Sequence, residues 1–225
     1  MHFPTLCYRH KMNVKKRGQI VMGRKPLSKE QRERTRQQLF EASNRMIAEH
    51  GIERLSIRTL CNEVGITYSS FYDYYKNKDD LIASKLGALD SYFVAHEDEL
   101  LRNEDAITNI KNYIQLYSDF SSERNLDIIR EVYRMQMYRI ILNTQNPHRP
   151  LYTILHRILL EGLEKNQLRD DISIEETTRI ILSFCKGIVI EWCICDGSYP
   201  LSEFSATAAA VFSASFCKQQ GSLSH

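Results

Sequence analysis

The sequence has few residues that interrupt helices and no apolar run of membrane length. Five prolines and nine glycines are spread over 225 residues, and the segments between them carry apolar residues at spacings of three and four, which is typical of amphipathic helices. No apolar run approaches the roughly 18 residues of a membrane span, and residues 1–20 lack the apolar stretch and cleavage site of a secretory signal. We therefore expect an all-α protein in the cytoplasm, with no membrane partner.

The sequence also lacks the patterns on which catalysis depends. No H-x-x-x-H, G-x-S-x-G or phosphate-binding G-x-x-x-x-G-K-S/T motif occurs, and His96, His148 and His156 stand singly. No nucleophile, base and orienting group are brought together by spacing. We predict that the protein is not an enzyme and that it holds no cofactor and no metal.

Cysteines are present without the paired spacing of a structural zinc site. The six are Cys7, Cys61, Cys185, Cys193, Cys195 and Cys217. Cys193 and Cys195 are two residues apart, so on a helix they point to different faces. We expect reduced thiols, although a thiol-based redox sensor that uses Cys185, Cys193 or Cys195 is an alternative function.

Charge is distributed unevenly along the chain. The sequence as a whole has 30 Lys and Arg against 28 Asp and Glu, but residues 1–80 hold 16 basic and 9 acidic residues, and the remainder holds 14 and 19. A polyanion would therefore be attracted to the N-terminal part of the chain alone.

Three helices are expected close together in this basic part. Apolar spacing predicts helices over Lys29–His50, Ile57–Glu63 and Tyr68–Tyr75, with Ser56 and Thr67 as N-caps of the second and third. Gly65 lies between the last two, where a residue without a Cβ permits the positive φ of a sharp turn. This is the spacing of a helix-turn-helix, whose second helix enters the major groove of DNA.

The third helix and its rim carry the candidate DNA contacts. Thr67, Tyr68 and Ser69 lie at the helix N-terminus, where free N–H groups and hydroxyls approach base edges, and Lys78 is placed to pair with a backbone phosphate. Phe71 and Tyr75 are assigned to the core. The alternative is a tyrosine-rich packing surface surrounded by solvated charges.

Across residues 30–85 the sequence resembles the TetR (tetracycline repressor) family. The matching segments are Leu39-Phe40-x-Ala42-Ser43-x-x-Met46-Ile47-x-x-x-Gly51, Gly65-Ile-Thr-Tyr-Ser-Ser-Phe-Tyr72 and Tyr75-Lys-Asn-Lys78-Asp-Asp-Leu81. The resemblance implies an all-helical homodimer that binds double-stranded operator DNA and is released by a small-molecule effector. It places Thr67, Tyr68 and Ser69 at bases, Tyr72, Tyr74 and Lys78 at phosphates, and Arg58 on the positioning helix.

The sequence departs from the family pattern at Ser69, where glycine is frequent, and at Phe71 and Tyr75, where leucine and phenylalanine are usual. The operator sequence therefore does not transfer. The expected domains are a flexible basic extension over 1–28, with an alternative start at Met22 and a minor-groove arm at Arg24 and Lys25, a helix-turn-helix DNA-binding domain over 29–77, and a helical regulatory and dimerisation domain over 78–218.

Two features of the C-terminal domain carry predictions. Helices over Ser173–Cys195 and Leu201–Cys217 are too apolar for packing on one side only, so we expect them to form a four-helix bundle with a second subunit; an intramolecular core is the alternative. The predicted interface residues are Ile181, Phe184, Ile188, Trp192, Phe204, Ala208, Val211 and Phe212.

Aromatic and soft side chains are also concentrated between residues 92 and 138, and they suit a pocket for a flat or apolar organic compound. The predicted lining residues are Tyr92, Tyr113, Tyr117, Phe120, Tyr133 and Met137. Plain core packing of these aromatics is an equal alternative. A ligand-released repressor is thus the favoured function, and a helical interaction module without operator binding is a further alternative.

Overall fold

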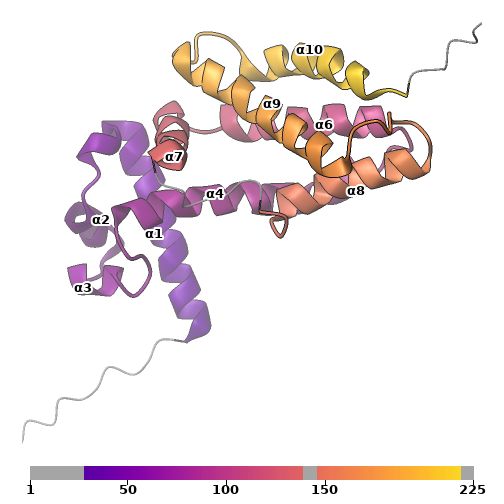
Figure 1. The fold of residues 1–225 in the computed structure, drawn as a ribbon. Coiled ribbons are helices and arrows are strands. Elements are labelled where there is room, and N and C mark those ends of the chain that lie inside the picture. Colours follow the sequence, from indigo (N-terminus) through magenta and orange to yellow (C-terminus); the bar gives the residue numbers. More distant parts are fainter. Residues whose placement is uncertain (1–27, 139–145, 219–225) are drawn as a thin grey trace, which may run out of the picture.

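The computed structural model describes residues 28–138 and 146–218, and these are helical with no β-strand among them (Figure 1). The predicted all-α class is therefore confirmed. The extension over 1–27, with Met22, Arg24 and Lys25, lies outside the described residues. No helix in the described ranges is both long enough and apolar enough to cross a membrane.

The N-terminal head contains the three expected helices. They are α1 (Lys29–His50), α2 (Ile57–Val64) and α3 (Tyr68–Phe71), with the short 3-10 helix η1 (Ile52–Arg54) after α1. The Oγ of Ser56 accepts from the Thr59 N–H at 3.1 Å, and the Oγ1 of Thr67 accepts from the Ser70 N–H at 3.1 Å. Both predicted N-caps are thus confirmed, because each satisfies an N–H that the helix itself leaves unpaired.

The turn between α2 and α3 depends on one glycine. Gly65 adopts φ 75° and ψ 31°, the left-handed helical region, and its N–H reaches the Asn62 carbonyl while the Ile66 N–H reaches the Cys61 carbonyl. A residue with a Cβ is strained in this conformation. The third helix is shorter than predicted, since it ends at Phe71 and the chain continues to Tyr75 as turns.

The C-terminal body is built from longer helices. In chain order they are α4 (Lys78–Ala95), α5 (Glu97–Leu100), α6 (Ala106–Ser122), α7 (Leu126–Tyr138), α8 (Pro150–Glu164), α9 (Ile174–Ile194), α10 (Leu201–Ser213) and the 3-10 helix η2 (Ala214–Phe216). Helix α4 runs from the head into the body, and α9 and α10 lie on the outer side of the body, away from α4 (Figure 1).

Two hydrophobic cores hold the molecule together, and two helices belong to both. In the head core, Leu81 and Ile82 of α4 are buried with residues of α1 to α3. Further along the same helix, Leu89 and Phe93 are buried in the body core. Helix α7 also contributes buried residues to both cores, and Val132 is one of those in the head core. The predicted boundary between residues 77 and 78 therefore falls just before a helix that both domains share.

A substitution at Gly162 tests how closely the helices of the body are packed. A Cβ at this position of α8 would lie 2.5 Å from the Cβ of Ala106 and 2.7 Å from Cδ1 of Leu168. We expect Gly162→Ala to lower the free energy of unfolding by about 1–3 kcal/mol through overpacking, as measured by urea denaturation. Gly87→Ala is the matched control, because Gly87 of α4 is exposed with no atom within 4 Å of its Cβ position.

At Gly87 the substitution should raise stability by up to about 1 kcal/mol through helix propensity alone. Equal effects of the two substitutions would contradict the close approach of α8 to α6.

Candidate nucleic-acid interface and adjoining cavity

The exposed side of α3 is formed by two tyrosines and a serine. Tyr68 and Tyr72 are 51% and 46% exposed, and Ser69 between them is also exposed. The Tyr72 hydroxyl donates to the Tyr68 hydroxyl at 2.7 Å, and the two rings meet edge to face with centroids 5.4 Å apart. Large aromatic rings that are exposed to water are typical of a binding surface.

The opposite side of the same segment anchors it. Phe71 is fully buried and Tyr75 is 2% exposed, both in the head core, which confirms their assignment to the core. The exposed rings of Tyr68 and Tyr72 are therefore presented from a fixed base, and the segment is not folded away inside the molecule.

Three of the predicted DNA contacts already have a structural role in the protein. The Thr67 hydroxyl caps α3 and is 3.0 and 2.7 Å from the hydroxyls of Ser69 and Ser70. Tyr74 is half-buried and packs against the head core. The Lys78 ammonium donates to the Ile52 carbonyl of η1 at 2.8 Å. Arg58, in the first turn of α2, is exposed.

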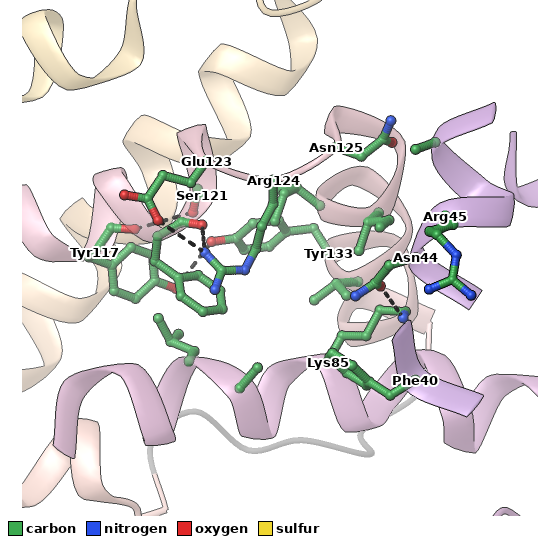
Figure 2. A pocket seen from close by; sticks show the side chains of 17 residues that line it. Phe40, Asn44, Arg45, Lys85, Tyr117, Ser121, Glu123, Arg124, Asn125 and Tyr133 are labelled. Carbon is green, nitrogen blue, oxygen red and sulfur yellow. Dashed lines mark hydrogen bonds and ion pairs between the residues drawn. The ribbon is translucent and has the colours of Figure 1, made fainter. Parts of the chain in front are cut away.

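A cavity of about 410 Å³ lies between the head and the body. Its walls come from α1, α4, α6, the link between α6 and α7, and α7 itself (Figure 2). This volume is within the range of small-molecule sites. Tyr117, Phe120 and Tyr133, which the sequence placed in a pocket, all line the cavity, and the hydroxyls of Tyr117 and Tyr133 are 3.1 Å apart.

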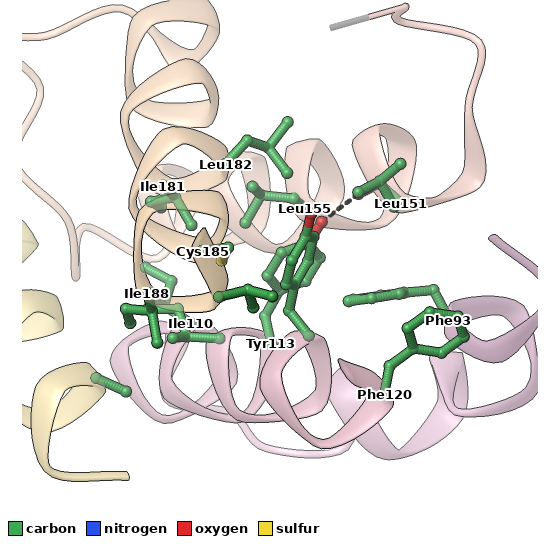
Figure 3. Packing of buried hydrophobic residues seen from close by; sticks show 14 of the residues in the cluster. Phe93, Ile110, Tyr113, Phe120, Leu151, Leu155, Ile181, Leu182, Cys185 and Ile188 are labelled. Atoms are coloured by element: carbon green, nitrogen blue, oxygen red, sulfur yellow. Dashed lines mark hydrogen bonds between the residues drawn. The ribbon is translucent and has the colours of Figure 1, made fainter. Parts of the chain in front are cut away.

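The other three predicted pocket residues lie elsewhere. Tyr113 is fully buried in the body core, where its hydroxyl donates to the Leu151 carbonyl at 2.7 Å (Figure 3). Met137 is 71% exposed. Tyr92 packs against Phe120 from outside the cavity, with ring centroids 5.3 Å apart. For these three the pocket prediction is wrong, because the cavity takes up only part of the surface of α4, α6 and α7.

The sequence prediction missed the part of the wall that comes from the head and from α4. Phe40, Asn44 and Arg45 of α1 line the cavity together with Lys85 of α4. One signal was available, since Lys85 stands four residues from both Leu81 and Leu89, on the face of α4 that is otherwise apolar. A cation at such a position is buried and must be accommodated by its neighbours.

Lys85 is 5% exposed, and its ammonium is held by the head. Its Nζ donates to the Ser43 Oγ at 2.9 Å and to the Asn44 Oδ1, and it lies 4.3 Å from the centroid of the Phe40 ring. Burial lowers the pKa of Lys85 to about 7, because the charged form is disfavoured away from water.

The predicted dimer surface divides into two sets of residues. Ile181, Ile188 and Trp192 are at most 7% exposed within the single subunit, since α9 packs on α6, α7 and α8. These three belong to the intramolecular core, and their assignment to an interface is corrected. The other five are at least partly exposed; they are Phe184, Phe204, Ala208, Val211 and Phe212.

The cysteines do not support the redox alternative. Cys185 is fully buried in the body core, and burial raises the pKa of its thiol far above the ordinary value. Burial raises the pKa of Cys193 to about 11, and a hydrogen bond with Glu191 raises the pKa of Cys195. Thiols that stay protonated at neutral pH react slowly with oxidants. Within the described residues no group of three potential metal ligands occurs.

Comparison with known proteins agrees with this geometry. The family model for bacterial regulatory proteins of the tetR family matches residues 39–84, which include most of the head and the start of α4. The fatty acid metabolism regulator protein of Bacillus subtilis is 23% identical over 172 residues, which are 75% of this chain and 88% of that protein.

Solved structures show the same fold over most of the chain. A TetR transcription regulator from Haloarcula marismortui is similar with a TM-score of 0.61 at 19% identity, over 83% of this chain and 100% of that one. The transcriptional regulator FadR from Bacillus subtilis, solved in complex with stearoyl-CoA, is similar with a TM-score of 0.59 at 16% identity, over 80% and 98%. Residues 39–84 thus match the family model of the tetR-family bacterial regulatory proteins, and the chain as a whole has the fold of the TetR transcription regulator from Haloarcula marismortui.

Proposed function

We propose that the protein is a dimeric, cytoplasmic repressor that leaves its operator when a small molecule binds in the cavity between head and body. The observation that carries this proposal is the composition of the cavity wall, which includes α1 of the head as well as helices of the body. A ligand inside it contacts the head directly. A ligand can shift the position of the head only if it binds one arrangement better than the other, and a wall shared by both parts provides that difference.

In this proposal the exposed side of α3 reads DNA. Tyr68 and Ser69 approach base edges in the major groove, and Tyr72 and Arg58 contact phosphates on either side. Thr67 contributes mainly by capping α3 and so by aiming its N–H groups at the duplex. Lys78 contacts a phosphate at the rim, where its ammonium is shared with the Ile52 carbonyl.

The dimer is formed by α9 and α10. Phe204 and Val211 of α10 are 46% and 74% exposed, and Phe184 of α9 stacks on Phe212 of α10 with centroids 3.7 Å apart. Ile180 and Ile194 add exposed apolar surface on α9. Exposed apolar surface of this kind is stabilised by burial against a second copy. A dimer places two heads on two half-sites of one operator.

The relatives support a response to a ligand. FadR of Bacillus subtilis was solved with stearoyl-CoA bound, and the cavity here, at about 410 Å³, is large enough for a compact organic molecule.

Tyr68→Ala tests the reading face. We expect it to lower affinity for a duplex enriched from a random library by roughly 10- to 100-fold, because a base contact is worth about 1–3 kcal/mol. Affinity for a scrambled duplex should change little. Fluorescence anisotropy with both duplexes measures this, and Arg102→Ala, which removes an exposed cation from the body, is the control. An equal loss on both duplexes would reject base reading by Tyr68.

Arg58→Ala and Lys78→Met test the phosphate contacts. Each should weaken binding similarly for all sequences and reduce the slope of log K against log salt concentration by about 1, since each removes one neutralised phosphate. Anisotropy titrations at several salt concentrations give the slope. Lys78→Met should in addition lower stability, because the Ile52 carbonyl loses its donor. If stability falls and the slope does not, Lys78 has only a structural role.

Val211→Glu tests the dimer. A charge in the middle of an apolar interface is costly to bury, so the variant should be monomeric at micromolar concentration in light scattering after gel filtration. Its operator affinity should fall at least about 100-fold, because one head alone then makes half of the contacts. Val94→Glu is the matched control, since Val94 is a 52% exposed valine on α4, and it should remain dimeric. A dimeric Val211→Glu protein would place the interface elsewhere.

A further inference from the structure

The charge on the cavity wall is not balanced. Among the described residues, Lys85 forms no ion pair with a carboxylate; its partners are the Ser43 hydroxyl and the Asn44 amide oxygen. An ammonium has three donors, so one of them remains for another acceptor. Burying a cation without a counter-charge is costly, and among the described residues the groups that offset this cost are two neutral oxygens and one aromatic ring.

The other two cations on the wall are already occupied. Arg45 pairs with Glu63 of α2 at 2.8 Å. The Arg124 guanidinium lies 3.3 Å from the centroid of the Phe120 ring, donates to the Phe120 carbonyl and is 3.9 Å from a Glu123 oxygen. Lys85 is therefore the position at which an incoming anion would be stabilised most.

The rest of the cavity suits an apolar body. Lys85 lies at the end formed by α1, and Tyr117 and Ser121 lie at the opposite end (Figure 2). Between them the surface is mostly aliphatic and aromatic; it includes Ala88, Leu89, Phe120, Ile128, Ile129 and Val132. A molecule that spans this space is apolar along its length and charged at one end.

We propose that the cavity takes an organic acid whose anionic group accepts a hydrogen bond from the Lys85 ammonium and whose apolar or aromatic body fills the space toward Tyr117. The inference rests on the proposed function only for its consequence on DNA. The same ammonium holds Ser43 and Asn44 of α1, so an anion that accepts from its third donor and draws it into the cavity acts on a contact between the head and α4.

Titration of Lys85 gives this site a characteristic pH dependence. Burial lowers the pKa of Lys85 to about 7, so the ammonium is charged below pH 7 and mostly neutral above it. Tyr117 of α6 and Tyr133 of α7 stay protonated, because burial raises the pKa of each. The remaining charged groups on the wall are Arg45 on α1 and Glu123 and Arg124 on the α6–α7 link. An anion should bind more tightly at low pH.

Two fluorescent probes with the same aromatic skeleton test the proposal. 8-Anilino-1-naphthalenesulfonate carries a sulfonate, and N-phenyl-1-naphthylamine does not. We expect Lys85→Met in the full-length protein at about pH 6 to lower the affinity for the anionic probe by 10-fold or more. The affinity for the neutral probe should fall by less than about 2-fold. Lys165→Met removes an exposed lysine and should change the affinity for neither probe. Ala88→Phe fills the cavity and should lower the affinity for both probes.

The unmodified protein provides a test that does not depend on a variant that folds. Its affinity for the anionic probe should fall between about pH 6 and pH 8.5, while its affinity for the neutral probe stays constant. Equal effects of Lys85→Met on both probes, or pH-independent binding of the anionic probe, would overturn the proposal.

Operator binding, measured on the same samples, separates this inference from the proposed function. A protein that binds DNA but does not distinguish the two probes refutes the organic-acid site alone. A protein that distinguishes the probes but binds no DNA refutes the repressor and leaves the site standing.

Discussion

Helix α4 buries its first half in the head and its second half in the body, and the arrangement of both domains depends on this sharing. Leu81 and Ile82 belong to the head core, and Leu89 and Phe93 to the body core. Helix α4 runs without a break from Lys78 to Ala95, so one continuous helix joins the head core to the body core. Lys85 stands between the two sets, and its bonds to α1 therefore lie where the head and the body meet.

The positions of the helices could be predicted from the sequence because their signals are local. A cap such as Ser56 or Thr67 bonds a backbone N–H three residues away, and Gly65 meets a backbone requirement at its own position. The helix-turn-helix resemblance rests on one contiguous stretch for the same reason. The end of α3 was less predictable: the apolar spacing that continues to Tyr75 reflects burial in the head core, and the backbone there has already left the helix.

The lining of the cavity could be predicted only in part, because periodicity identifies an apolar face without identifying what covers it. Tyr113 and Tyr117 are four residues apart on the same side of α6, yet Leu151 of α8 lies opposite the first and Tyr133 of α7 opposite the second. The same limit applies to α9, where Ile181 and Ile188 are covered within the subunit. The contribution of α1 was not predictable at all, since it depends on how the head and the body are placed in three dimensions.

In the proposed mechanism, the buried ammonium of Lys85 connects ligand binding with the position of the head. Among the described residues, the charged form of Lys85 is stabilised by three neutral groups, all of which belong to α1. A bound anion supplies a counter-charge, which raises the pKa of Lys85 above the value of about 7 that burial gives it and weakens the dependence of the ammonium on Ser43 and Asn44. Coupling is reciprocal, so an arrangement of the head that holds Asn44 close to Lys85 must also lower affinity for the anion. DNA that selects such an arrangement would then oppose ligand binding, by the same free energy with which the ligand opposes DNA.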